Sequence, residues 1–309
     1  MPNIFGPVPS RRLGLSLGVD LIPGKTCTYD CLYCQVGQTT YKITEPKSYT
    51  PVQDIVDELK QCLDNTQPDT ITLAGTGEPT LDVQLGQVIS GIKKITAIPV
   101  AILTNGALLW REDVRERVAD ADIIMPTMTT VFENTFRAIH RPHEKLELLM
   151  IINGMKELRS SFQGRIHMEV VFLAGINDTS HEIEGLRAIL HEISPDKIQI
   201  NTVVRPPSDS KAKALDMGQL EDIKVFFGDK AEIIAHVPLK QGKGPASSPS
   251  ETLLEMAKRR PVRVIDIAHI LNKSPEEIER LLKGLLIKGA IQRQEHGGEW
   301  FFMTVKNRP

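Results

Sequence analysis

Three of the four cysteines in the chain lie within one stretch of eight residues. Cys27, Cys31 and Cys34 follow the spacing C-x3-C-x2-C. This spacing allows a single tight loop to direct three thiolates toward one point, which is what a metal ion or a metal cluster requires. The three cysteines are therefore candidate metal ligands rather than packing residues.

Two simpler explanations of these cysteines compete with a cluster. A structural zinc site takes four Cys or His ligands. However, Cys62 falls in a helical pattern of apolar residues, where a small core residue is expected, and the first histidine is His140. A zinc site with a distant fourth ligand remains an alternative. A disulfide is disfavoured, because nothing marks the chain as secreted and three clustered thiols cannot all pair.

The aromatic residue before the last cysteine, Tyr33, adds to the motif, which resembles the signature of the radical S-adenosylmethionine (radical SAM) superfamily. An iron–sulfur cluster usually takes four cysteines, so three leave one iron of a 4Fe–4S cluster open. The resemblance implies that Cys27, Cys31 and Cys34 bind this cluster and that the open iron chelates S-adenosyl-L-methionine (SAM). It also implies reductive cleavage of SAM to a 5′-deoxyadenosyl radical that abstracts hydrogen from a substrate.

A glycine-rich turn follows the strand expected at residues 70–74. The turn, Gly75-Thr76-Gly77-Glu78-Pro79, resembles the Gly-Gly-Glu-Pro motif of the superfamily, with Thr76 in place of the first glycine of that motif. Glycine lets a backbone approach a ligand closely. The resemblance implies that Glu78, together with Gly75 and Gly77, holds the amino group of SAM.

Three further strand ends carry candidate SAM contacts. Thr104-Asn105-Gly106 reads as a tight turn, but the same tripeptide lies near SAM in the superfamily, so Asn105 is a candidate for the ribose side. The resemblance also implies a ribose contact from Thr127, which is expected just after a strand. Ile176, in the segment 174–179, would flank the adenine together with Tyr33.

Four residues are candidates for the substrate side of the site: Arg12, His140, Arg141 and Arg205. For Arg11-Arg12 a solvated surface pair is favoured, and the alternative is a segment over the active-site mouth that holds an anionic group. For the stretch 140–143, a substrate-facing loop and plain surface are equally supported.

The pattern of apolar runs predicts an α/β protein. Six expected strands alternate with helices, at residues 15–22, 70–74, 99–103, 123–125, 165–173 and 197–202. Such alternation makes a parallel sheet with right-handed crossovers. We therefore expect a partial (β/α)6 parallel barrel over residues 1–235, as the resemblance also implies, with ligands at the carboxyl ends of the strands. One of its helices is expected to start with Thr50 as N-cap, Pro51 at the first position and Gln53 completing a capping box.

The C-terminal part is expected to be a separate domain. Residues 236–250 are rich in Gly, Ser and Pro and are expected to be a linker. Residues 251–309 predict three helices and a β-hairpin, which resembles a winged helix. This part carries eleven Lys and Arg against eight Asp and Glu. Three glutamates at the start of its third helix disfavour DNA binding, and a protein-docking module, an RNA-contacting module or a lid on the barrel competes with it.

Bulk composition places no strong limit on partners. The 309 residues are 41% hydrophobic and carry a net charge of −2. The net charge of the chain therefore does not favour binding to nucleic acid or to a membrane. We expect no signal peptide and no membrane span, since no apolar run approaches the roughly 20 residues that a span needs. A reducing cytoplasm suits free thiols and an oxygen-sensitive cluster.

These observations favour a radical SAM enzyme, an oxidoreductase or transferase that depends on iron–sulfur chemistry. The N-terminal Gly6-Pro7-Val8-Pro9-Ser10-Arg11-Arg12 segment resembles a subgroup of largely uncharacterised iron–sulfur oxidoreductase-like proteins, distantly similar to the tRNA wyosine-forming radical enzymes. The substrate is open (a small molecule, RNA, including a modified RNA base, or a protein), and an electron donor such as flavodoxin or ferredoxin is expected. The alternatives are a cluster-bearing redox sensor with a winged-helix output and a glycyl-radical activating enzyme. Only Cys62 is left for a second cluster, which disfavours subfamilies with auxiliary clusters.

Overall fold

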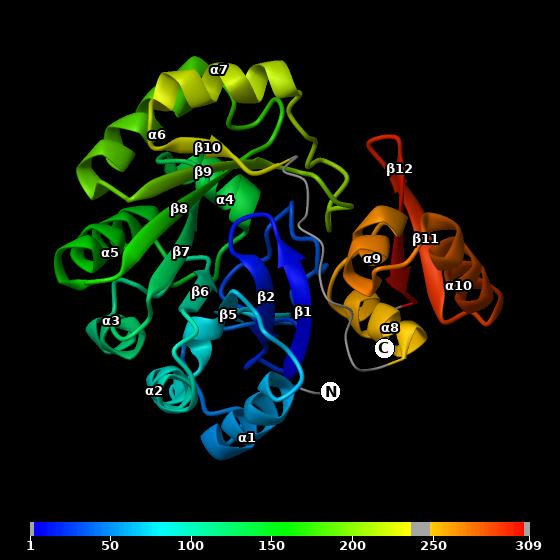
Figure 1. Ribbon diagram of the computed structural model, residues 1–309. Helices are drawn as coiled ribbons and strands as arrows, with labels where there is room; N and C mark the ends of the chain where they lie inside the picture. The colour runs from blue at the N-terminus through cyan, green and yellow to red at the C-terminus, as the bar shows by residue number, and fades with distance from the viewer. Residues whose placement is uncertain (1–2, 236–247, 306–309) are drawn as a thin grey trace.

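A computed structural model describes residues 3–235 and 248–305 of the protein. Within these residues, no helix combines the length and the apolar character that crossing a membrane would require. The larger part of the chain is a mixed α/β unit built on one sheet, and a smaller helical unit lies beside it (Figure 1).

The sheet of the larger unit has eight strands in the order β1-β2-β5-β6-β7-β8-β9-β10. Every neighbouring pair from β2 onward is parallel, and β1 pairs with β2 in the antiparallel sense. The strands are β1 (Ile4–Ser10), β2 (Gly14–Val19), β5 (Thr70–Leu73), β6 (Val100–Thr104), β7 (Ile123–Met128), β8 (Arg165–Phe172), β9 (Lys197–Thr202) and β10 (Ala231–Ile233). This parallel sheet is consistent with a radical SAM partial barrel. All six expected strands are present, whereas β1 and β10 were not predicted as strands.

Helices cover the outer face of the sheet in an arc (Figure 1). They are α1 (Val52–Leu63), α2 (Leu85–Ile95), α3 (Glu112–Val118), α5 (Leu148–Ser161), α6 (Ser180–Ile193) and α7 (Met217–Phe227). Strand residues such as Ile71 and Leu73 belong to the main apolar core with α1 and α2. Alternate strand residues point to the other face. On β2 and β5 this face is polar, and the hydroxyls of Ser16 and Thr72 lie 2.6 Å apart, whereas β6 and β7 carry a small apolar cluster there.

One predicted helix start is wrong. The N-cap of α1 is Pro51 rather than Thr50, and no side chain caps this helix. The backbone of Pro51 is extended (ψ 133°), so the first helical residue is Val52. The side chain of Gln53 binds Asp57, one turn further along, instead of completing a capping box.

The two edges of the sheet are tied together by an arginine. Arg11, in the turn after β1, donates hydrogen bonds from Nη1 to the carbonyl oxygens of Ile234 (2.8 Å) and Ala235 (2.7 Å), just beyond β10. Its neighbour Arg12 forms an ion pair with Glu169 of β8, at 3.3 Å. The favoured prediction of a solvated Arg11-Arg12 surface pair is therefore wrong, because both side chains bind residues at or beyond distant strands of the sheet.

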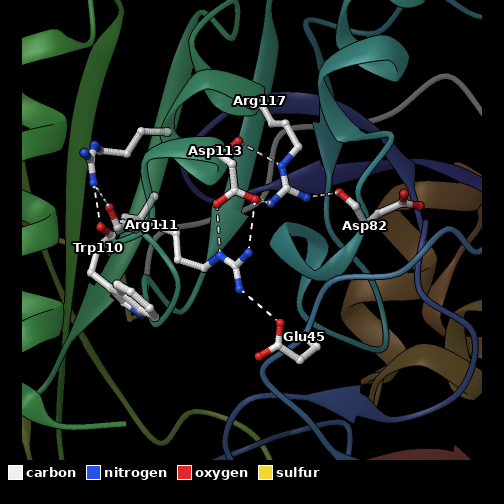
Figure 2. A network of polar contacts seen from close by, with 8 residues as sticks. Glu45, Asp82, Trp110, Arg111, Asp113 and Arg117 are labelled. Carbon is white, nitrogen blue, oxygen red and sulfur yellow. Dashed lines mark hydrogen bonds and ion pairs between the residues drawn. The ribbon is translucent and has the colours of Figure 1, made fainter. Parts of the chain in front are cut away.

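An ion-pair network connects α3 with the loops that follow the cysteines and the glycine turn (Figure 2). Asp113 binds both Arg111 and Arg117 at 2.9 Å, and Arg111 also reaches Glu45 at 3.2 Å. Arg117 donates to the carbonyl oxygen of Asp82 at 3.0 Å. These contacts attach the loop after the cysteines and the loop after the glycine turn to the same helix, α3.

The smaller unit contains α8 (Pro249–Arg259), α9 (Val264–Leu271), α10 (Pro275–Ile287), β11 (Ile291–His296) and β12 (Glu299–Thr304). It has its own apolar core, and Val8 of β1 packs against that core. Ser274 caps α10 in a capping box with Glu277. Most of the predicted linker, residues 236–247, lies outside the described residues, and α8 begins at Pro249. The winged-helix assignment stays a prediction.

Candidate functional site

The cysteine loop follows β2 and leans on the end of α4 (Glu133–His140). The backbone N–H groups of Asp30 and Leu32 donate to the carbonyl oxygens of His140 and Ile139, both at 2.9 Å. Cys27 lies in β3 (Thr26–Cys27), which pairs with β4 (Tyr41–Lys42). The loop is thus fixed from both sides at the carboxyl end of the sheet, as the sequence predicts for β2.

Each of the three cysteines has a polar neighbour from a different segment. Asn105 Nδ2 lies 3.4 Å from Cys27 Sγ, His140 Nδ1 lies 3.1 Å from Cys31 Sγ, and Lys25 Nζ lies 3.0 Å from Cys34 Sγ. Side chains that hydrogen-bond to metal ligands, without binding the metal themselves, fix the orientation of those ligands and adjust the properties of the metal site. Lys25 was not among the predicted site residues. Its position two residues before the first cysteine is the sequence feature that could have pointed to it.

Burial and one nearby cation act in opposite directions on the ionisation of the cysteine loop. Burial raises the pKa of Cys27 to about 11 and that of Cys31 well above its usual range. Burial lowers the pKa of Lys25, but the thiolates of Cys34, Cys27 and Cys31 outweigh that effect and raise it. Lys25 thus interacts electrostatically with all three cysteines. Ligands of this kind bind as thiolates, so metal binding releases their protons.

All four cysteines are free thiols. Within the described ranges, no group of three or more His, Cys, Asp or Glu side chains surrounds a single-ion position. A four-iron cluster takes each cysteine on a separate iron, so its ligands need not meet at one ion. The donor set of three thiols in one loop, each with a polar neighbour, fits such a cluster.

His140 is a buried residue of α4, so its prediction as a surface or substrate-facing residue is wrong. Its side chain is 2% exposed, and Nε2 lies 2.7 Å from the hydroxyl of Thr129. Burial lowers the pKa of His140 to about 3, so the ring is neutral at ordinary pH. When Cys31 is a thiolate it carries no proton, so Nδ1–H must donate to Sγ while Nε2 accepts from Thr129.

Glu78 is 3% exposed, and its carboxylate is engaged by the chain itself. Oε1 accepts from the Thr80 amide (3.1 Å), the Thr80 hydroxyl (2.7 Å) and the Thr104 hydroxyl (2.6 Å). Oε2 accepts from the Asn105 amide at 2.8 Å. Burial raises the pKa of Glu78, and these hydrogen bonds oppose the shift. The carboxylate therefore joins the end of β5 to the end of β6 and positions Asn105 beside Cys27.

The glycines before Glu78 have a packing reason. A Cβ on Gly75 would lie 2.0 Å from the carboxyl group of Asp20, and one on Gly77 would lie 2.4 Å from the carbonyl oxygen of Thr26. Asp20 also accepts from the amide and hydroxyl of Thr76, at 3.1 and 3.2 Å. The turn is thus held against the chain after β2, and the approach of its backbone to SAM stays a prediction.

The remaining predicted SAM residues fall into two groups. Thr127 lies inside β7 rather than after it, and its hydroxyl donates to Glu169 Oε2 at 3.1 Å. Glu169 also accepts from Asn201 at 2.8 Å, so Thr127 belongs to the polar inner face of the sheet that Arg12 joins. Tyr33 and Ile176 pack against one apolar cluster, and their contact with adenine stays a prediction.

The two other arginine candidates contact the cysteine loop or its neighbour but, among the described residues, none of the three cysteines. Arg141 has a left-handed backbone (φ 43°) and forms ion pairs with Asp209 and, at 4.0 Å, with Asp30. Arg205 is 8% exposed and contacts Asp266 of α9 at 3.7 Å. Arg205 therefore lies at the junction of the two units.

The family model described as "Radical SAM superfamily" matches residues 21–214, which include all three cysteines and the glycine turn. The chain belongs to the radical SAM superfamily. Its membership makes it an enzyme of that superfamily, whose members use SAM and a 4Fe–4S cluster.

Several known proteins are similar to this radical SAM protein. It is 35% identical to UPF0026 protein MJ1312 of Methanocaldococcus jannaschii, over 100% of this chain and 98% of that protein. A protein named GTPase Obg from Brachyspira hyodysenteriae is 37% identical over 94% of this chain. The chain spans only 44% of the Brachyspira protein.

Solved structures share the fold at low identity. TYW1 with a lysine-pyruvate adduct has a TM-score of 0.56 at 16% identity, covering 74% of this chain and 76% of that chain. Streptococcus suis SuiB bound to precursor peptide SuiA has a TM-score of 0.55 at 16% identity, covering 70% and 48%. Likeness at this identity shows the fold alone.

Proposed function

We propose that the protein binds a 4Fe–4S cluster through Cys27, Cys31 and Cys34 and cleaves SAM reductively to a 5′-deoxyadenosyl radical, which abstracts hydrogen from a substrate. The observation that carries this proposal is the polar neighbour of each cysteine at the carboxyl end of a parallel sheet. The bound cluster supplies the electron, whereas the protein supplies position, charge and exclusion of water.

The chain's own residues have separate tasks in this proposal. Lys25, Asn105 and His140 orient the three thiolates by hydrogen bonds, and the Lys25 ammonium offsets part of their negative charge. Glu78 holds the glycine turn and the Asn105 backbone in place, and Glu78 with Gly75 and Gly77 is the proposed contact of the SAM amino group. Asn105 and Thr127 are the proposed ribose contacts, and Tyr33 with Ile176 offers the apolar surface for adenine.

The smaller unit is proposed to be a winged-helix-like lid rather than a DNA-reading module. Asp266 of α9 contacts Arg205, and His296 Nε2 donates to the Val203 carbonyl oxygen at 2.9 Å. Both contacts are with the loop after β9, and the three glutamates at the start of α10 disfavour contact of that helix with DNA phosphates. A reducing compartment such as the cytoplasm, and a flavodoxin or ferredoxin as electron donor, complete the proposal.

The test is an anaerobic assay for 5′-deoxyadenosine. We expect the reconstituted and reduced protein to form 5′-deoxyadenosine from SAM, and the same protein without reductant to form none. SAM is also expected to change the electron paramagnetic resonance (EPR) signal of the reduced cluster. A cluster whose signal SAM leaves unchanged would contradict the enzyme and favour a redox sensor with the smaller unit as its output.

Replacing His140 with phenylalanine is expected to make the reduction potential of the cluster more negative. The substitution removes the Nδ1–H donor to Cys31, and hydrogen bonds to cluster sulfurs favour the more negatively charged, reduced state. Losing such a supporting contact typically costs about 10–100-fold in activity. The measurement is a potentiometric EPR titration. His167→Phe, a change at a buried histidine in β8, serves as the control. Equal potentials in the wild type and His140→Phe would show that Nδ1 does not donate to the thiolate.

A further inference from the structure

A cavity of about 270 Å³ lies between the inner face of the sheet and α8 of the smaller unit. Its floor includes Ser16 and Thr72, the polar residues of β2 and β5 that face away from the helices. Five arginines also line it: Arg11, Arg12, Arg205, Arg259 and Arg260. Among the described residues that line this cavity, none is Asp or Glu. The cavity is therefore strongly cationic.

The carboxylates that pair with Arg205 and Arg12 also bind other side chains. Arg205 lies 3.7 Å from Asp266, but Asp266 also binds Arg263 at 2.9 Å. Arg12 lies 3.3 Å from Glu169, which also accepts from Thr127 and Asn201. Buried charges are normally paired or hydrogen-bonded, because desolvation is costly. Arg259 pairs with Glu255 at 3.2 Å and with Asp20 at 4.0 Å. Four carboxylates therefore stand against the five cavity arginines, and Asp266 is shared with Arg263, which leaves positive charge in excess.

Arg205 shows this excess most clearly. Its side chain is 8% exposed, and its buried Nε has no hydrogen-bond partner within the part of the chain that the structure describes. Its Nη1 reaches Gln35 at 3.4 Å, next to the cysteine loop. Burial lowers the pKa of Arg205 far below its usual range, and Arg260 and Arg11 lower it further. An anion in the cavity would relieve each of these effects.

We propose that this cavity binds the phosphate group of a small-molecule substrate. The arginines come from three segments, namely the β1–β2 turn, the loop after β9 and α8. Donors from several directions suit a tetrahedral phosphate better than a planar carboxylate, which a single arginine can bind along one edge. The volume suits a compact group and lies near the lower limit of small-molecule sites. The inference rests on the proposed function, because the cavity also borders Gly75 and Gly77 of the predicted SAM turn.

The smaller unit thereby becomes part of the binding site. Arg259 and Arg260 end α8, and Arg259 also stacks on Phe5 of β1, with 4.5 Å from its guanidinium carbon to the ring centroid. A phosphate between α8 and the β1–β2 turn would bridge the two units.

The test is calorimetric titration of the full-length, cluster-loaded protein with inorganic phosphate, without reductant or SAM. A parallel titration uses acetate at the same ionic strength. We expect saturable one-to-one binding of phosphate and at least tenfold weaker binding of acetate. Arg205→Lys keeps the charge but loses the paired donors of the planar guanidinium, and Arg260→Gln loses the charge.

Each substitution is expected to weaken phosphate binding by at least about tenfold, because each removes one charge-assisted hydrogen bond. Arg165→Gln, an exposed arginine at the start of β8, is the matched control and should leave phosphate binding unchanged.

A second measurement needs no variant. Phosphate is expected to slow the modification of Arg205 by phenylglyoxal in the wild type, as mapped by mass spectrometry, and not that of Arg165. The proposal is overturned if the wild type binds no phosphate, if acetate binds as tightly, or if Arg165→Gln weakens binding as much as the cavity variants. Phosphate binding by a protein that forms no 5′-deoxyadenosine when reduced would refute the proposed function but not the site. Formation of 5′-deoxyadenosine without phosphate binding would refute the site alone.

Discussion

Replacing Cys34 with alanine is expected to abolish both cluster binding and the cleavage of SAM. Cys34 is one of only three thiols in the loop, and Cys62, the remaining cysteine, lies on α1 against the main core. With two thiolates left, the loop cannot hold an iron–sulfur cluster of the usual kind. The substitution should also lower the pKa of Lys25, since the thiolate of Cys34 is the strongest influence that raises it.

The measurement is iron content, visible absorption and 5′-deoxyadenosine formation after anaerobic reconstitution. Iron and product should fall to background in Cys34→Ala. Cys62→Ala is the matched control, because it removes a partly buried thiol outside the loop, and it should keep both. Full iron content and product in Cys34→Ala would contradict the assignment of the cluster ligands.

Replacing Glu78 with glutamine is expected to destabilise the larger unit and to disturb the cluster. The carboxylate accepts four hydrogen bonds from Thr80, Thr104 and Asn105. An amide NH2 in place of one oxygen would face donors, so at least one buried bond to a charged acceptor is lost, at about 1.5–3 kcal/mol each. Asn105 would then no longer be held 3.4 Å from Cys27.

Urea unfolding and the EPR spectrum of the reduced cluster measure these two effects. Glu182→Gln is the matched control, since Glu182 is a buried glutamate of α6 that accepts from the Thr130 hydroxyl, away from the cysteines. That control should shift the unfolding midpoint less and leave the spectrum unchanged. A Glu78→Gln protein with wild-type stability and spectrum would show that the carboxylate does not organise the site.

Local signals in the sequence determined most of the fold. The six inner strands and the motifs at their ends were found because apolar runs, turn residues and cysteine spacing are properties of short stretches. The strands β1 and β10 escaped the same reasoning: β1 contains Gly6, Pro7 and Pro9, and β10 has only three residues. Thr127 was placed after β7 for a similar reason, since Pro126 suggested that the strand had ended.

The sequence by itself thus indicated the family, the cysteine loop and the positions of six strands, all of which depend on residues close together in the chain. Only the tertiary structure decided what surrounds them. His140 meets Cys31 across 109 residues because α4 ends behind the cysteine loop. Arg205 meets Asp266 because the smaller unit packs on the sheet, and Glu169 reaches Thr127 through the register of β7 and β8. Such contacts depend on packing and register, which no local pattern of residue types records.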